Sequence, residues 1–373
     1  MAWLSADDSS FDEFVAVVEQ TVDPADYAFA ARVDHGAVVY DAHALRSGDR
    51  FHHELAAELA HAFSDGPGIV VFEGAVAPAI VDAATIEFRA IIEHERSSGI
   101  ASGDHFAANG VNDRVWNALQ KLARRSPEVF ADYYANDVIA AASAAWLGPG
   151  YQVTSQVNVV NPGGQAQVPH RDYHLGFMND DQAERFPAHV HRLSPALTLQ
   201  GAIAHCDMPV ESGPTMYLPH SHKFEAGYVA ARRDDIKAYF AEHHVQLALT
   251  KGDAVFFNPA MFHGAGTNRT TDISRVANLL QVGSAMGRTL EAVDRREMVE
   301  LLYPTLLARA EAGGDRAALD RVVAASAEGY PFPCDLDVDQ PVDALVPPSD
   351  ADIVRLALTE RWPPSRLAVE LTA

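Results

Sequence analysis

Between residues 151 and 285 the sequence is a series of short β-strand patterns separated by turns, and this constrains the fold more than any other feature. The run Tyr151–Val160 alternates polar and β-branched residues. Short apolar runs follow at 196–204, 215–218, 245–249, 254–257 and 276–282, with Gly, Pro and Asp between them. Many short strands with such turns are typical of a sandwich or barrel and not of a parallel sheet. We therefore expect a mostly β core over residues 151–285.

The regions on either side of this core favour helices. Helical patterns cover residues 51–63, 78–96, 112–124, 126–134 and 137–147, with one strand pattern at 69–72. We expect residues 1–150 to pack on the core as a largely helical region. Residues 286–373 then form an extension that is helical at 290–312, rich in proline, and helical again near 350–360.

Composition excludes several classes of partner. The 373 residues include 51 acidic and 28 basic side chains, a net charge of −23, so phosphate backbones and anionic lipid surfaces should be repelled. We expect no nucleic-acid partner and no membrane association. The two cysteines, Cys206 and Cys334, are too few for a disulfide framework. The first residues lack the pattern of a signal peptide, which predicts a cytoplasmic protein. No feature determines the oligomeric state.

His170 and Asp172 are the strongest candidate metal ligands. Residues two apart in an extended strand point to the same face, so both side chains can reach one ion. His263 lies far downstream, just after an apolar run. Two His and one carboxylate on one face of a metal form the facial triad of non-haem Fe(II) oxygenases, whose opposite face stays open. Alternatively, His170 is an ordinary half-buried histidine and Asp172 caps a loop.

The residues beside His170 and Asp172 allow weaker predictions. Side chains alternate along a strand, so Arg171 and Tyr173 should point away from the ligands. His174 would then line the pocket, with ordinary loop packing as the alternative. Four further histidines are not assigned to the metal: His189, His191, His205 and His220.

Arg275 opens the apolar strand at 276–282. An arginine that points into a barrel needs a partner, and a carboxylate ligand bound by two hydrogen bonds would supply one. The alternative is a rim arginine that pairs with Asp272. Arg269 is a rival candidate, but its polar loop favours solvation.

A cluster of turn residues and strand at 212–223 resembles the phytanoyl-CoA dioxygenase family of Fe(II)/2-oxoglutarate-dependent oxygenases. The chain has His220 where members usually have Gly. The likeness extends to the His170-x-Asp172 pair, the His263-Gly264-Ala265-Gly266 stretch, Arg275 and the segment at 68–74, and covers about residues 55–285. The matching residues of the cluster are Gly213, Pro214, Pro219, Ser221, His222 and Lys223, together with Asn268 further on.

The resemblance implies a double-stranded β-helix, a jelly-roll, cupin-like barrel with the iron inside one mouth. By similarity, His170, Asp172 and His263 hold Fe(II), and Arg275 pairs with the distal carboxylate of 2-oxoglutarate. A polar residue on the preceding strand often helps to bind this co-substrate. Asn158 is the candidate, with Gln156 on the same face. Many relatives have Ser at the position of Ala265, so one co-substrate hydrogen bond is expected to be missing.

The activity implied is that of a dioxygenase that uses O2 to hydroxylate an unactivated C–H of a small-molecule metabolite and releases succinate and CO2. Halogenating members carry a small residue in place of the carboxylate, so Asp172 predicts hydroxylation, with desaturation and ring closure left open. Two other classes remain open: a non-redox metalloenzyme, such as an isomerase or hydrolase, and a non-catalytic binding protein on the same barrel. No feature of the sequence selects the substrate.

Overall fold

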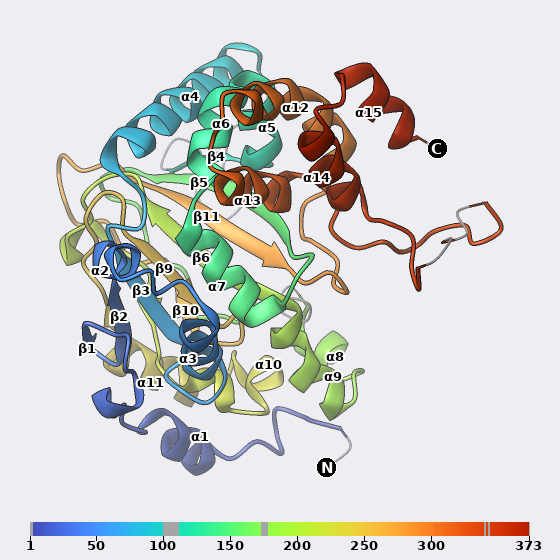
Figure 1. Cartoon of the computed structure of the whole chain (residues 1–373). Helices are drawn as coiled ribbons and strands as arrows, with labels where there is room; N and C mark the ends of the chain where they lie inside the picture. Colours follow the sequence, from blue (N-terminus) through green and yellow to red (C-terminus); the bar gives the residue numbers. More distant parts are fainter. Residues whose placement is uncertain (1–2, 100–111, 173–177, 339–340, 342–343, 373) are drawn as a thin grey trace.

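The strands of the protein form two hydrogen-bonded sheets. A computed structural model describes residues 3–99, 112–172, 178–338, 341 and 344–372 (Figure 1). The larger sheet has the order β1-β2-β3-β9-β6-β11-β5-β4 and the smaller one β10-β7-β8. The strands are β1 (Arg32–Asp34), β2 (Ala37–Asp41), β3 (Ile69–Glu73), β4 (Asn112–Val115), β5 (Gln152–Val160), β6 (Thr198–Ala204), β7 (Met216–Tyr217), β8 (Val245–Gln246), β9 (Ala254–Phe257), β10 (His263–Gly264) and β11 (Arg275–Gly283).

From β5 onwards the chain passes back and forth between the two sheets. Strands β5, β6, β9 and β11 belong to the larger sheet, whereas β7, β8 and β10 belong to the smaller one. The segment around His170 joins the smaller sheet through a bridge to His263. This alternation is the topology of a double-sheet jelly roll. The predicted double-stranded β-helix is therefore confirmed.

Alternation along the central strands separates an inner face from an outer one. Gln156 and Asn158 of β5 line the space between the sheets, together with Leu279 of β11. Val157 and Val282 point the other way, into the main hydrophobic core. The antiparallel register of β5 and β11 places Leu279 opposite Gln156. Polar residues therefore line one side of strands whose other side is sealed by apolar packing.

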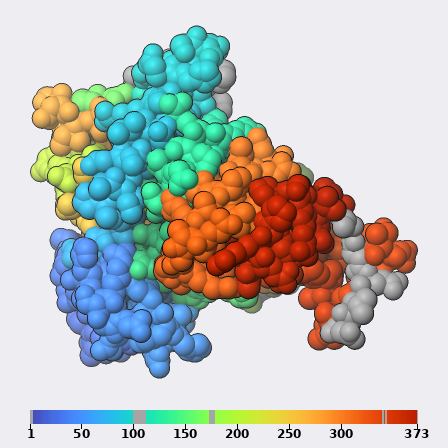
Figure 2. Space-filling view, turned by 45° about the horizontal axis from the view of Figure 1, so that its top comes forward, coloured from blue at the N-terminus to red at the C-terminus, as the bar shows by residue number. Residues whose placement is uncertain are grey.

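Helices cover the outer face of the larger sheet, and Figure 2 shows the C-terminal helices (orange to red) beside those at 118–147 (green). The helices are α1 (Phe11–Val18), α2 (Ala42–Ser47), α3 (His53–Ser64), α4 (Pro78–Ser97), α5 (Ala118–Arg125), α6 (Pro127–Tyr134), α7 (Asp137–Leu147), α8 (Asp180–Ala183), α9 (Ala188–Leu193), α10 (Gly227–Ala230), α11 (Asp234–His243), α12 (Arg295–Glu311), α13 (Arg316–Ser326), α14 (Asp350–Glu360) and α15 (Pro364–Glu370). Within the described ranges, no helix is both long and apolar enough for a membrane span.

The helix predicted over residues 112–124 is wrong in its first half. Residues Asn112–Val115 form β4, which pairs antiparallel with the edge of β5, and α5 starts only at Ala118. Asn117 has a left-handed backbone with φ of 51°, which separates the two elements. The free edge of β5 supplies hydrogen bonds that a sequence pattern does not show.

The larger sheet also takes strands from outside the predicted core. Strands β1 to β4 lie before residue 150, and β3 pairs with β9 in the middle of the sheet. The division of the chain at residues 150 and 285 stays a prediction.

Candidate active site

His170, Asp172 and His263 come together at one end of the space between the sheets. Each offers one ligand atom, and these atoms lie within 4.8 Å of one another. Nε2 of His263 is 3.5 Å from Oδ2 of Asp172, and Nε2 of His170 is 3.7 Å from Oδ1. The bridge between His170 and His263 fixes the two segments side by side. The geometry required for a shared ion is thus present, and metal binding itself stays a prediction.

Both imidazoles are oriented through their other nitrogen. Nδ1 of His170 lies 2.8 Å from the main-chain oxygen of Val168, and Nδ1 of His263 lies 2.9 Å from that of Met261. When Nδ1 carries the proton and donates it to a carbonyl, Nε2 keeps its lone pair for a metal. Both Nε2 atoms point towards Asp172.

Asp172 is held as a carboxylate. Burial by itself would raise the pKa of this buried side chain, but His263, His170 and a hydrogen bond from Gln200 together lower the pKa to about 2. Burial also lowers the pKa of His170, which favours the neutral imidazole. Deprotonated carboxylate and neutral imidazole are the forms that bind metals. Two nitrogens and one oxygen on one side, with a cavity on the other, fit Fe(II) with open positions.

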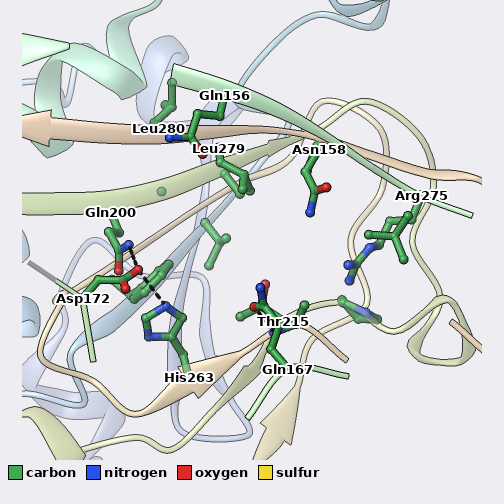
Figure 3. Close-up of a pocket in the computed structure, with 18 of the residues that line it drawn as sticks. Gln156, Asn158, Gln167, Asp172, Gln200, Thr215, His263, Arg275, Leu279 and Leu280 are labelled. Atoms are coloured by element: carbon green, nitrogen blue, oxygen red, sulfur yellow. Dashed lines mark hydrogen bonds and ion pairs between the residues drawn. The ribbon is translucent and has the colours of Figure 1, made fainter. Parts of the chain in front are cut away.

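A cavity of about 1190 Å³ extends from these ligands between the two sheets. Arg275 projects into it opposite Asp172 and His263, and Asn158 points in from β5 (Figure 3). Much of the remaining wall is apolar. It includes Leu247, Leu249, Val255, Phe257 and Leu279. A mostly apolar pocket with a few convergent polar groups is the usual form of a small-molecule site.

Arg275 has no carboxylate partner in the described part of the chain, although it is only 6% exposed. Burial lowers the pKa of its guanidinium to about 10, so it remains a cation near neutral pH. Oδ1 of Asn158 is also buried, and no described residue forms a hydrogen bond with it. Buried polar groups in native proteins normally have partners. A dicarboxylate such as 2-oxoglutarate would reach the metal with one end and Arg275 with the other.

The structure does not match either alternative to a cavity-facing Arg275. Asp272 does not pair with Arg275, and Arg269 is exposed and does not line the cavity. Ala265 lines the cavity with a methyl group, so it offers no side-chain hydrogen bond there. The expectation that Arg171 points away from the ligands is confirmed by its contacts with Tyr228 and Phe262. Tyr173 and His174 lie outside the described residues.

Gln200, Gln167 and Thr215 also line the cavity and were not predicted. Gln200 donates to Oδ2 of Asp172, which orients the carboxylate. The only signal for it in the sequence is one amide in an otherwise apolar strand run, 196–204. Gln167 and Thr215 sit in loop and turn sequences, where polar residues are ordinary.

The motif around residues 213–223 lines the cavity with Pro214, Thr215 and Tyr217, and its other residues support the site from outside. His220, where the family usually has Gly, has a left-handed backbone with φ of 65°, a conformation that favours glycine. Gly213 has φ of 71°, and a Cβ there would lie 2.4 Å from the backbone of Thr267. Oγ of Ser221 accepts a hydrogen bond from the backbone N–H of Phe262. These residues therefore fix the turns that carry the metal-site strands.

Known proteins resemble this chain in sequence. It is 25% identical over 233 residues to Dioxygenase trt7 of Aspergillus terreus, a match that covers 61% of this chain and 73% of the relative. It is 29% identical over 117 residues to Dioxygenase cdmD of Talaromyces verruculosus, covering 31% of this chain and 34% of the relative. The chain thus spans about a third of the length of this second relative.

Solved structures show a weaker likeness. One is the non-haem alpha-ketoglutarate-dependent carbocyclase SnoK from nogalamycin biosynthesis, at 21% identity and a TM-score of 0.43, covering 61% of this chain and 83% of that one. Another is HygX from Streptomyces hygroscopicus with nickel and 2-oxoglutarate bound, at 15% identity and a TM-score of 0.42, covering 64% and 90%.

A family profile also matches the chain. The profile described as "Phytanoyl-CoA dioxygenase (PhyH)" matches residues 64–277, more than half of the chain and the part that contains every candidate ligand. The predicted cofactors, Fe(II) and 2-oxoglutarate, fit the donor set and the unpaired arginine of the cavity. The chain therefore belongs to the phytanoyl-CoA dioxygenase family.

Proposed function

We propose that the protein is an Fe(II)- and 2-oxoglutarate-dependent dioxygenase that hydroxylates an unactivated C–H of a small-molecule substrate. One observation carries the proposal. The His170–Asp172–His263 group and the unpaired Arg275 face each other across a single cavity. A 2-oxo dicarboxylate is a ligand that would satisfy both ends at once.

The residues of the chain have separate tasks in this reaction. His170, Asp172 and His263 would hold Fe(II), which supplies the oxidising power together with 2-oxoglutarate and O2 when it is bound. Arg275 anchors the distal carboxylate, and Asn158 donates its amide to the co-substrate. Gln200 keeps the Asp172 carboxylate in place. The apolar walls exclude water from the reacting groups.

Asp172 favours hydroxylation over halogenation. With a metal bound, its carboxylate would take the coordination position that a chloride ion would need, and its negative charge would oppose a second anion. In the balanced reaction one oxygen atom of O2 enters the substrate C–H as a hydroxyl. The other oxygen enters succinate as 2-oxoglutarate loses CO2. Once a substrate is found, a product with one labelled oxygen from isotopic O2 supports this outcome, and a chlorinated product contradicts it.

The first experiment needs no substrate. Fe(II)-loaded protein with 2-oxoglutarate and O2 should release succinate slowly, and an Asp172→Ala variant should not. If the wild-type protein binds metal and 2-oxoglutarate but forms no succinate with any member of a metabolite panel, a non-redox enzyme or a binding protein is the better description.

A further inference from the structure

Arg171 lies in the chain between two predicted ligands, His170 and Asp172, and is itself almost wholly buried. It is 3% exposed and faces away from the cavity. Its Nη2 donates to the main-chain oxygens of Ser221 and Phe224, the latter at 2.8 Å. Within the described ranges no carboxylate pairs with Arg171. Carbonyls and not a counter-charge satisfy Nη2, and the buried Nε has no hydrogen-bond partner there.

Aromatic faces complete this environment. The guanidinium carbon lies 5.2 Å from the ring centre of Tyr228 and 4.8 Å from that of Phe262. Both distances are within the range of cation–π attraction. Burial lowers the pKa of Arg171 to about 10, so the side chain remains charged near neutral pH. A buried charge is costly unless hydrogen bonds and polar contacts compensate it.

The segment 221–228 that binds Arg171 also contacts the chain beside the other ligands. The hydroxyl of Tyr228 donates to the main-chain oxygen of Asp172 at 3.1 Å. Oγ of Ser221 accepts from the backbone N–H of Phe262 at 2.8 Å, and Phe262 directly precedes His263. One segment therefore binds the backbone of Asp172 and the backbone of the residue before His263. It also binds the side chain of Arg171, the residue after His170.

Gly227 shows how closely this segment packs on Arg171. A Cβ built at Gly227 would lie 1.8 Å from Cζ of the guanidinium. Real Cβ contacts never come this close, so any larger residue must displace Arg171 or the segment. The fit of this loop to the guanidinium is thus tight enough to transmit small displacements to the neighbouring ligands.

We propose that Arg171 is a positioning residue of the metal centre. It fastens the His170–Asp172 segment and Phe262, the residue before His263, to the 221–228 segment, and so sets the spacing of the three ligand side chains. The inference rests on the proposed function in one respect, that these three residues bind the metal. It adds that a buried cation outside the cavity determines how well they do so.

The test compares variants by Ni(II) affinity, measured by calorimetry, and by the charge-transfer absorption of the anaerobic Fe(II)–2-oxoglutarate complex. Arg171→Met should weaken Ni(II) binding by roughly 10–100-fold, as for other groups that orient metal ligands, and should shift the absorption band. Gly227→Ala should act in the same direction by displacing the guanidinium. Arg171→Lys keeps a cation that can reach the carbonyls, and should restore most of the affinity.

Arg295 offers a matched control. It also donates to main-chain oxygens, those of Val153 at 3.0 Å and Ala325 at 3.5 Å, and burial lowers its pKa to about 10. Arg295 contacts β5 and α13 and does not line the cavity. Arg295→Met should therefore leave Ni(II) affinity and the absorption band unchanged, whatever its effect on the melting temperature.

The outcomes separate the two proposals. Wild-type affinity and spectrum in both Arg171→Met and Gly227→Ala overturn the positioning role and leave the proposed function intact. An equal loss in Arg295→Met also overturns it, because the effect is then one of general stability. If Arg171→Met does not fold, Gly227→Ala and Arg171→Lys decide the question. Absence of Ni(II) binding in the wild-type protein overturns both proposals.

Discussion

Arg171 and Arg275 are both buried arginines without a carboxylate partner among the described residues, yet their surroundings are opposite. Arg171 donates to two main-chain oxygens and lies against two aromatic rings. Arg275 faces a cavity and makes no such contact with any residue that the structure describes. Carbonyls and aromatic rings of the fold surround the first guanidinium, although its buried Nε has no hydrogen-bond partner among the described residues. The second faces open space that a ligand can fill. A buried charge therefore indicates a binding site only when the protein does not itself supply its partners.

The largest loss of binding should follow substitution of the predicted metal ligands, next to which both arginines are proposed to act. Asp172→Ala or His263→Ala leaves only two protein ligands, so we expect metal affinity to fall by more than the roughly 10–100-fold that orienting groups cause. Affinity for 2-oxoglutarate should fall as well, because the metal chelates one end of it. Calorimetry with Ni(II) measures both. His189→Ala, which removes an exposed histidine, is the control and should change neither. Wild-type metal affinity in either ligand variant would place the metal elsewhere.

Arg275→Met should produce the next largest effect and distinguishes the two arginines directly. Loss of the charge-assisted pair should weaken 2-oxoglutarate binding by about 2–5 kcal/mol, while metal affinity stays close to that of the wild type. Because the cation has no carboxylate partner among the described residues, its removal should not lower the free energy of unfolding. Titration of 2-oxoglutarate into the metal-loaded protein tests the first point and urea unfolding the second. Arg269→Met, at an exposed position, should leave both unchanged. A loss of co-substrate affinity in Arg269→Met alone would transfer the role to that residue.

Glu291 is an acidic counterpart of the unpaired arginine, and it should make stability depend on pH. It lines the cavity, and burial raises the pKa of its carboxyl to about 7 from an ordinary value of 4.5, against the lowering effects of Asn117, Lys121 and Arg114. Between these pH values the folded protein keeps a proton that the unfolded chain releases. The free energy of unfolding should therefore decrease as pH rises through this window, by up to about 3 kcal/mol in total.

A Glu291→Gln variant tests this directly. It keeps an acceptor for the backbone N–H of Asn117 but cannot ionise. Urea unfolding at pH 5 and pH 8 should show that the wild type loses more stability over this range than the variant does. Parallel losses in the two proteins would show that Glu291 ionises in the folded state as easily as in water.

The smallest effect is expected at Asn158. Its side chain points into the cavity, where its Nδ2–H can donate to an oxygen of the co-substrate. Asn158→Ala should weaken 2-oxoglutarate binding by about 0.5–1.5 kcal/mol, the usual net value of one neutral hydrogen bond. The same titration as for Arg275→Met measures it. An effect as large as that of Arg275→Met would mean that the amide, and not the cation, is the main anchor.

The sequence pattern predicted those helices and strands whose formation depends mainly on the residues within them. The helix predicted at 137–147 matches α7 in both bounds, and the one near 350–360 matches α14. The predicted ligands meet because strand alternation and the jelly-roll topology are general rules. The strand β4 was missed because it exists through pairing with the edge of β5. The environment of Arg171 could not be predicted either, since it depends on where residues 221–228 pack in three dimensions.

The close approach of Gly227 to Arg171 has a consequence for how this sequence can diverge. Because a side chain at position 227 would occupy the space of the guanidinium, neither position can change freely while the other stays as it is. A relative that keeps the arginine should keep the glycine, and one with a shorter residue at 171 is free to fill the space from 227. The two positions should therefore vary together across the family, although they are 56 positions apart in the chain.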